Sequence, residues 1–332
     1  MGSLSPTFRQ RLEFFGLSCG AFVVRQFPFW WLRPVARILG TVVCLLDKRG
    51  RDVGRANLEA AFPEGLSEKE AARIIRQSYQ GFARTMLELI WAPNLTPENF
   101  KQFTRVEGLA ADRAEPEQPT IYLCLHASNF EWLSLALSYA VGPGIVVTQN
   151  FKNPLLGQMF DEFRSSTGHT IIPQERAMIR MLRHLKNGGY FNLVVDLNLD
   201  PRESSVIIDQ FDGLKTCVTQ MHAALALHTG ARIVPAECRP QEDGTYRLIY
   251  HKPLSYSKDA TPEEVAQLCW DTLEPYVREH PEYWLWSYKH WRFKPSDRSD
   301  ERYPFYANAA KRFDKKLNAS SHAIETAAIQ PA

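Results

Sequence analysis

The sequence predicts an α/β protein with a mixed β-sheet flanked by helices, preceded by a helical amino-terminal segment. From about residue 106 onward, short apolar runs alternate with segments of helical periodicity, a pattern typical of α/β domains. The apolar runs hold few polar residues, as expected for strands that are covered on both faces. Residues 1–55 differ from the rest because basic and aromatic side chains are mixed into a strongly apolar background.

Composition narrows the function classes. The chain has 332 residues, of which 45% are hydrophobic and 23% charged, so it is long enough for one large domain or two small ones. The net charge of +2 gives no reason to expect a nucleic-acid partner. The six cysteines are scattered without a CxxC pair, which predicts buried free thiols and no metal site.

Residues 1–55 predict amino-terminal helices that associate with a membrane. The longest run without a charge is Phe14 to Val24, 11 residues, whereas a spanning helix needs about 20. Pro28 and Pro34 argue against one unbroken helix. Aromatic residues beside arginines favour a segment lying in the lipid interface, with the arginines on anionic headgroups. The alternative is a helical hairpin packed on the main domain.

Residues 56–105 predict a helical lead-in that is continuous with the next domain. Apolar residues recur at three- and four-residue steps between Ala71 and Ile90. Ser67 and Glu70 have the spacing of a capping box at the start of this helix. The stretch "APNLTPENF" predicts the turn that ends it.

Residues 106–296 predict the catalytic α/β domain, and residues 297–332 turn polar and then Ala-rich, which predicts a poorly ordered tail. The helices are expected to begin near Ser128, Pro154, Glu175, Lys215 and Thr261. The predicted strands are "IYLCLH", "GIVVTQ", "HTIIP", "YFNLVVD", "SVIID", "ARIVPAEC" and "TYRLIYH".

A histidine and a glutamate stand out at the end of the first of these strands. His126 closes an apolar run, and sites in α/β domains gather at the carboxyl ends of strands. Glu131 follows five residues later, so the two side chains meet only if the chain turns between them. One hypothesis makes His126 a general base and Glu131 the group that orients it. The alternative is a buried structural histidine, with Ser128 and Glu131 forming a capping box.

Six ordered blocks of the chain resemble the bacterial lipid A late acyltransferases, within the wider lysophospholipid acyltransferase superfamily. The resemblance covers about residues 10–295. "HASNFEW" is similar to the family's His-x-Gly-Asn-Trp-Glu form, with His126 and Glu131 at its HX4E motif. The other blocks are "GRANLEAAFPEGLSEKEAARIIRQSYQGFARTMLEL", "NPLLGQMFDEFRSSTG", "NGGYFNLVVDLN", "TQMHAALALHTGARIVPAECR" and "PEYWLWSYKHWRF".

The resemblance implies the fold of the lysophospholipid acyltransferases and an O-acyltransferase activity. An acyl chain would pass from a thioester donor, typically acyl carrier protein or else acyl-CoA, to a hydroxyl of a glycolipid, foremost a lipid A precursor. The reaction would take place at the cytoplasmic face of a bacterial inner membrane. His126 would remove the hydroxyl proton, and Glu131 would orient and charge-stabilise His126. No metal or redox cofactor is implied.

The same resemblance assigns further residues, and each has a structural alternative. Arg164 would hold anionic groups of a substrate, or be a surface helix arginine. Asp196 would shape the acceptor pocket, or bond the backbone of its own loop. Thr219 would bond substrate or cap the helix after it, and Asn129 would cap a helix or support the site. The segment "WLWSYKHWRFKP" would face lipid, or contribute aromatic residues to the core.

Departures from the family pattern leave the acceptor open. Gln149 stands where the family usually has arginine, and Lys152 could supply the charge but not the forked geometry. The family usually has Asp-Gln after the later strand, whereas this chain has Asp196-Leu197-Asn198. Another acceptor, such as a phosphoglycolipid, an aminolipid or a lyso-phospholipid, therefore stays an alternative. A non-catalytic lipid-binding relative is a second alternative, and a hydrolase is a third.

Overall fold

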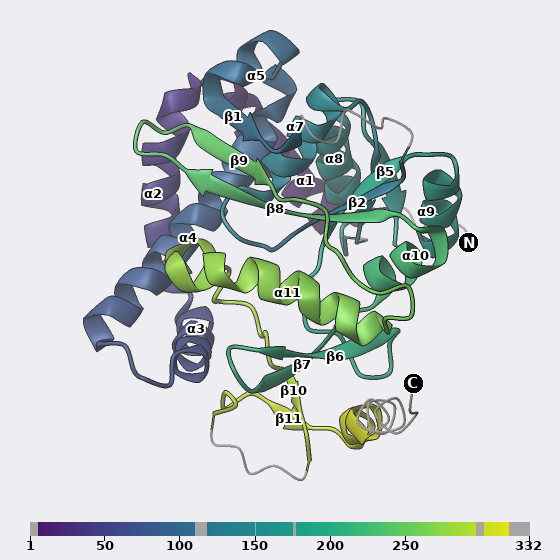
Figure 1. The fold of residues 1–332 in the computed structure, drawn as a ribbon. Helices are drawn as coiled ribbons and strands as arrows, with labels where there is room; N and C mark the ends of the chain where they lie inside the picture. The colour runs from purple at the N-terminus through teal and green to yellow at the C-terminus, as the bar shows by residue number, and fades with distance from the viewer. Residues whose placement is uncertain (1–5, 110–117, 150, 175–176, 297–301, 319–332) are drawn as a thin grey trace.

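The computed structural model describes residues 6–109, 118–149, 151–174, 177–296 and 302–318 (Figure 1). Its centre is a seven-stranded sheet of order β1-β9-β8-β2-β5-β3-β4. Neighbouring strands run parallel except β8 and β9, so the sheet is mixed, as predicted. The strands are β1 (Thr104–Glu107), β2 (Thr120–Cys124), β3 (Ile145–Thr148), β4 (Thr170–Pro173), β5 (Tyr190–Val194), β8 (Arg232–Pro240) and β9 (Tyr246–Tyr250).

Two apolar cores cover the two faces of this sheet, because successive side chains of a strand point to opposite faces. On β2, Ile121 and Leu123 enter one core, and Tyr122 and Cys124 enter the other. The first core also takes residues from α9 (Ala177–Lys186), α10 (Met221–Thr229) and α11 (Pro262–Glu279). The second takes residues from α5 (Pro97–Phe103) and α7 (Phe130–Ala140). α8 (Pro154–Ser165) packs against α1 and α4.

The seven predicted strands are confirmed, and one predicted helix is wrong. Residues from Leu214 to Thr219 form β7, which pairs antiparallel with β6 (Ser205–Gln210) as a separate two-stranded sheet. The turn between them uses positive φ angles at Phe211, Asp212 and Gly213, which closes a hairpin rather than starting a helix. α10 begins only at Met221. β1 was not expected because it is a short edge strand with three of its four residues exposed.

The lead-in is helical as expected, but its boundary differs. α3 (Lys48–Ala61) crosses residue 56 without a break, and α4 (Glu68–Trp91) follows it. Ser67 caps α4 by accepting a bond from the Glu70 backbone N–H, at 3.2 Å. The predicted turn after α4 holds a short 3-10 helix, η1 (Ala92–Asn94), and the start of α5.

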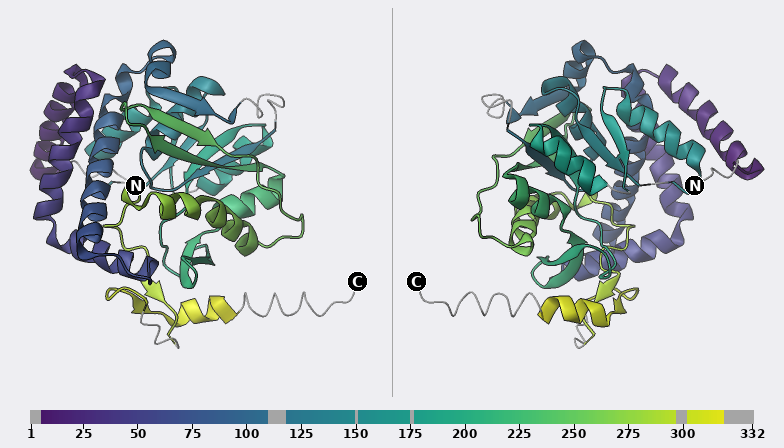
Figure 2. Two further views of the ribbon diagram at one scale, coloured as in Figure 1. Left: turned by 60° about the vertical axis from the view of Figure 1, so that its left-hand side comes forward. Right: turned by 90° about the vertical axis from the view of Figure 1, so that its right-hand side faces the viewer.

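The amino terminus forms two helices, α1 (Phe8–Gln26) and α2 (Phe29–Leu46), separated at Pro28 as expected. Both lie along one side of the molecule, outside α4 (Figure 2). α2 packs so closely on α4 at Gly40 that an added Cβ would lie 2.4 Å from the Cα of Gln80 in α4. The alternative of helices packed on the main domain is therefore correct for one face of α2. This buried stripe consists of Leu32, Ala36, Gly40 and Cys44.

The opposite face of these helices is apolar and exposed to the surroundings. By length and composition α2 is long and apolar enough to cross a membrane, with 18 residues and a mean hydropathy of 1.4. Only 22% of α2 is buried within the protein. The exposed large side chains include Phe8, Leu12, Phe15, Phe22, Trp30, Trp31, Ile38, Leu39, Val42, Val43, Leu45 and Leu46.

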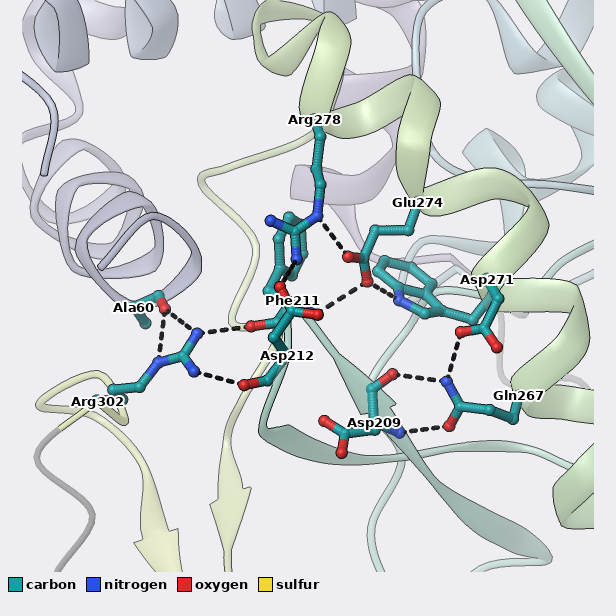
Figure 3. A network of polar contacts seen from close by, with 10 residues as sticks. Ala60, Asp209, Phe211, Asp212, Gln267, Asp271, Glu274, Arg278 and Arg302 are labelled. Carbon is teal, nitrogen blue, oxygen red and sulfur yellow. Dashed lines mark hydrogen bonds and ion pairs between the residues drawn. The ribbon is translucent and has the colours of Figure 1, made fainter. Parts of the chain in front are cut away.

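The tail is better packed than its composition predicts. Residues 302–318 lie on the domain, with Phe313 fully buried. Arg302 donates to the carbonyl oxygens of Ala60, Phe211 and Asp212 (Figure 3). These bonds tie the tail to α3 and to the β6–β7 turn, so the expectation of poor order is wrong for this part. Residues 297–301 and 319–332 lie outside the described residues.

Candidate active site

The sheet brings His126 next to Asp196. β2 and β5 are parallel neighbours, and Cys124 pairs in register with Val194. His126 lies two residues beyond Cys124, and Asp196 lies two residues beyond Val194. Both side chains therefore emerge at the carboxyl edge of the sheet, where sites in such folds gather.

The Asp196 carboxylate holds His126 through both of its oxygens. Its Oδ1 lies 2.7 Å from His126 Nδ1, and its Oδ2 accepts the His126 backbone N–H at 3.1 Å. Burial alone would raise the pKa of Asp196, but the charge and hydrogen bond of His126 outweigh burial and lower that pKa to about 2. An ionised carboxylate at this distance keeps the proton of the neutral imidazole on Nδ1. The lone pair is then on Nε2, which no described residue hydrogen-bonds.

A tryptophan from the block "PEYWLWSYKHWRF" is the other side-chain partner of Asp196. Trp284 Nε1 donates to Asp196 Oδ2 at 2.7 Å, and its ring stacks on His290 with 3.7 Å between centroids. Burial lowers the pKa of His290 to about 4, so this second histidine is neutral near pH 7. Trp286 and Trp291 are also fully buried. The three tryptophans of this block therefore belong to the core, and the lipid-facing alternative is wrong for them.

Glu131 does not orient His126. Its carboxylate forms an ion pair with Arg164 of α8, with Nη2 2.6 Å and Nε 3.1 Å from the two oxygens. Both side chains are largely buried, at 8% exposure for Glu131 and 19% for Arg164. The expected contact of Glu131 with His126 is therefore wrong. Asp196 is hydrogen-bonded to the imidazole, and Glu131 forms its ion pair with Arg164. Arg164 is accordingly no surface helix arginine.

The turn after His126 explains why Glu131 points away. Ser128 has a φ of 51°, and its backbone bonds to Tyr283 and Thr85 fix this conformation. Asn129, rather than Ser128, is the N-cap of α7, and its Oδ1 accepts from the Trp132 N–H at 3.2 Å. Asn129 Nδ2 also donates to the buried Glu88. The cap interpretation of Asn129 is confirmed, and the expected capping box of Ser128 with Glu131 is wrong.

Replacing Glu131 tests the ion pair. Glu131→Gln leaves the Arg164 guanidinium buried without its counter-charge, so the free energy of unfolding should fall by about 3 kcal/mol. Denaturant unfolding measures this loss. The double variant Glu131→Gln/Arg164→Leu should recover part of it, since no unpaired charge stays buried. Equal losses in the single and double variants would contradict the pairing.

The remaining expected site residues are spread over two places. Gln149 follows β3 and lines a pocket of about 820 Å³ along α8, together with Gln158, Asp161 and Glu162. Lys152 is exposed and does not line this pocket. Thr219 ends β7, and its Oγ1 accepts the Met221 N–H at 3.2 Å, which is a bond at the start of α10.

Sequence reasoning missed three groups that shape the site. Trp284 bonds the carboxylate, Thr85 donates to the Ser128 carbonyl at 2.9 Å, and Glu88 bonds Asn129. Glu88 in turn pairs with Arg84 and accepts from the Tyr246 hydroxyl. A carboxylate inside an apolar helical stripe is the only signal of such a role, because buried charges need partners.

The comparisons with known proteins decide the family. The model of the family described as bacterial lipid A biosynthesis acyltransferase matches residues 6–293. The chain belongs to this family. It therefore is a member of an acyltransferase family, and the resemblance carried by the six blocks is confirmed. The match covers both His126 and Asp196.

A curated relative of this acyltransferase family member is the phosphatidylinositol mannoside acyltransferase of Mycolicibacterium smegmatis. The two are 28% identical over 181 residues, which is 53% of this chain and 57% of the relative. The matched region thus spans somewhat more than half the length of the relative.

Proposed function

We propose that this protein moves a fatty acyl chain from a thioester donor to a hydroxyl of a membrane glycolipid. His126 Nε2 removes the hydroxyl proton as the oxygen attacks the thioester carbonyl carbon. The tetrahedral intermediate then collapses, the carbon–sulfur bond breaks, and the leaving thiolate takes the proton from His126. Asp196 holds the imidazole and stabilises its positive charge during the transfer.

The observation that carries this proposal is the open Nε2 of an imidazole held by an ionised, buried carboxylate. The free nitrogen has the position of a general base, and 18% of the histidine side chain is exposed to incoming groups. A direct transfer needs only this base and two bound substrates, so no acyl-enzyme is required. The family membership supports the same reaction type.

The acceptor proposed first is a lipid A precursor, with acyl carrier protein as the donor carrier. The lining of the pocket along α8 includes the amides of Gln149 and Gln158, the hydroxyls of Thr148 and Ser165, and the carboxylates of Asp161 and Glu162, beside apolar residues such as Phe151 and Ile171. Such groups pair with sugar hydroxyls, which fits a saccharide headgroup. A mannosylated phosphoinositide is the second candidate, because the curated relative bears that activity in its name.

The test is transfer of a radiolabelled acyl chain from acyl carrier protein to a panel of acceptors. The panel holds a tetra-acylated lipid A precursor, a mannosylated phosphoinositide and a lyso-phospholipid. Product on the lipid A precursor that disappears in His126→Ala supports the proposal. Histidine-dependent product on another lipid keeps the chemistry and replaces the acceptor. A folded protein that acylates none of them contradicts the proposed activity.

We further propose that the exposed apolar faces of α1 and α2 lie in the cytoplasmic leaflet of an inner membrane. Deleting these helices would expose the core beneath α2, so single substitutions make a cleaner test. Ile38→Glu places a charge on the exposed face of α2, where Ile38 is 65% exposed. The protein should then shift from the vesicle pellet to the supernatant when flotation or sedimentation is measured.

A matched control is available on the other side of the molecule. Ile179 on α9 is 52% exposed, and Ile179→Glu makes the same chemical change away from α2 (Figure 1). This variant should bind vesicles like the wild type. If Ile38→Glu sediments with vesicles as fully as Ile179→Glu does, the proposed seating on α2 is wrong.

A further inference from the structure

A small basic pocket lies where α2 passes into α3, beside the segment of residues 287–292. Its volume is about 320 Å³. It lies apart from the pocket along α8 and shares no lining residue with it. The residues that line it are Asp47, Arg49, Gly50, Val53, Ser287, Tyr288, Lys289 and Arg292.

Three cations and one carboxylate line the basic pocket, which leaves a formal excess of two positive charges. The Asp47 carboxylate is already engaged, because it accepts the Gly50 N–H at 2.8 Å and the Tyr79 hydroxyl at 2.7 Å. Among the described residues, Arg49, Lys289 and Arg292 form no ion pair within 4.0 Å. No described carboxylate within that distance neutralises these three charges, although Lys289 lies over the Tyr306 ring and Arg292 over the Phe293 ring. A guanidinium fits a phosphate well.

An apolar pocket of about 420 Å³ adjoins the basic one. The two share Ser287 and Tyr288, and the Tyr79–Asp47 hydrogen bond joins their walls. The apolar pocket lies between α2 and α4, and Val43 in its lining also belongs to the exposed apolar face of α2. Its lining consists of Gly40, Val43, Tyr79, Phe82, Ala83, Met86, Leu285, Ser287 and Tyr288.

One residue of the shared wall, Tyr288, and one of the basic pocket, Arg292, are bonded to the catalytic edge. The Tyr288 hydroxyl and Arg292 Nη2 both donate to the carbonyl oxygen of Asn198, at 3.4 and 3.3 Å. Asn198 lies two residues after Asp196, which holds His126. The boundary between the apolar and basic pockets is thus close to the loop that carries the partner of the general base.

We propose that Arg49, Lys289 and Arg292 bind the phosphate of the phosphopantetheine arm of the thioester donor, while the acyl chain enters the apolar pocket. This inference rests on the proposed function. In such a donor the thioester lies between the hydrocarbon chain and the phosphate-bearing arm. The pockets have the same order, apolar then basic, and their boundary lies beside the catalytic loop. A ligand bound across both would bring its thioester toward His126.

The test compares two donor mimics that cannot react. S-hexadecyl 4′-phosphopantetheine carries the phosphate, and S-hexadecyl pantetheine lacks it. Binding is measured by titration calorimetry with all proteins in the same detergent. Wild type should bind the phosphorylated mimic about tenfold more tightly. This preference should fall toward one in Arg49→Gln/Arg292→Gln, and Lys289→Gln alone should reduce it if the double variant does not fold.

The charge-matched control is Lys48→Gln/Lys252→Gln. Both lysines are exposed and do not line the basic pocket, so this variant loses the same net charge. It should keep the tenfold preference. An unchanged preference in Arg49→Gln/Arg292→Gln overturns the proposal. The proposal is also overturned if Arg49→Gln/Arg292→Gln raises the KM for a phosphate-bearing acceptor but leaves the KM for the donor unchanged. The basic pocket would then recognise the acceptor.

Failure of this inference is distinguishable from failure of the proposed function. The mimics report binding without turnover, so a pocket-dependent phosphate preference stands even if no acceptor is acylated. Conversely, histidine-dependent transfer with no pocket-dependent preference removes the phosphate site and leaves the acyltransferase activity in place.

Discussion

His126→Ala is expected to lower kcat for acyl transfer by about 10²–10⁴-fold or more, with little change in folding. Among the described residues at the carboxyl edge, the substitution removes the one imidazole that is held by a carboxylate and partly exposed to a substrate hydroxyl. Without a base, the attacking oxygen must lose its proton to water. The measurement is single-turnover transfer from labelled acyl carrier protein, beside a thermal melt of each protein.

Near-normal turnover in a folded His126→Ala protein would remove the general-base assignment. His290→Gln is an informative comparison because this second histidine is buried and neutral next to Trp284. Its loss should affect stability far more than the proton-transfer step. A larger loss of kcat in His290→Gln than in His126→Ala would exchange the roles of the two histidines.

Asp196→Asn is expected to lower kcat by about 10²–10⁴-fold while KM for the acceptor changes little. Asparagine has the size of aspartate but no charge, so the imidazolium that forms during transfer loses its stabilising partner. The amide also has a donor that would face Nδ1, which favours the tautomer with the proton on Nε2. That nitrogen then could not accept the hydroxyl proton.

The control for this variant is Asp200→Asn in the same loop. Asp200 pairs with Arg202 through a contact of 2.6 Å, and Arg202 is 69% exposed. Turnover should therefore stay close to wild type. An Asp196→Asn protein with wild-type kcat would mean that the hydrogen bond to His126 has no part in the reaction, and would return attention to Glu131.

The fold was largely predictable because the buried strands are continuous apolar runs separated by clear turn signals. The sequence also located His126 at the carboxyl end of a strand. It pointed to Glu131 as the partner of the imidazole, and gave Asp196 a role in the acceptor pocket instead. Glu131 is near in sequence, whereas Asp196 is 70 residues away and becomes a neighbour only through the register of β2 with β5.

Two other errors have similar causes. The sequence predicts a helix near Lys215, where the structure has β7, because the hairpin depends on positive φ angles at Phe211 and Asp212, which are not glycines. The tail was expected to be poorly ordered because its composition is polar. Its order comes from backbone carbonyl groups of distant segments that accept from Arg302 (Figure 3), and composition carries no information about such partners.

The close contact of α2 with α4 at Gly40 has a consequence for how the reaction would be driven. α4 carries Thr85, which is bonded to the turn after His126, so direct contacts connect the lipid-facing helix to the segment that carries the base. On the proposed seating, the bilayer sets the height of His126 above the headgroups. The protein then meets its acceptor in two dimensions, and turnover follows the mole fraction of glycolipid in the leaflet. Diluting the acceptor with inert lipid slows such a reaction, whereas adding buffer to the same vesicles does not.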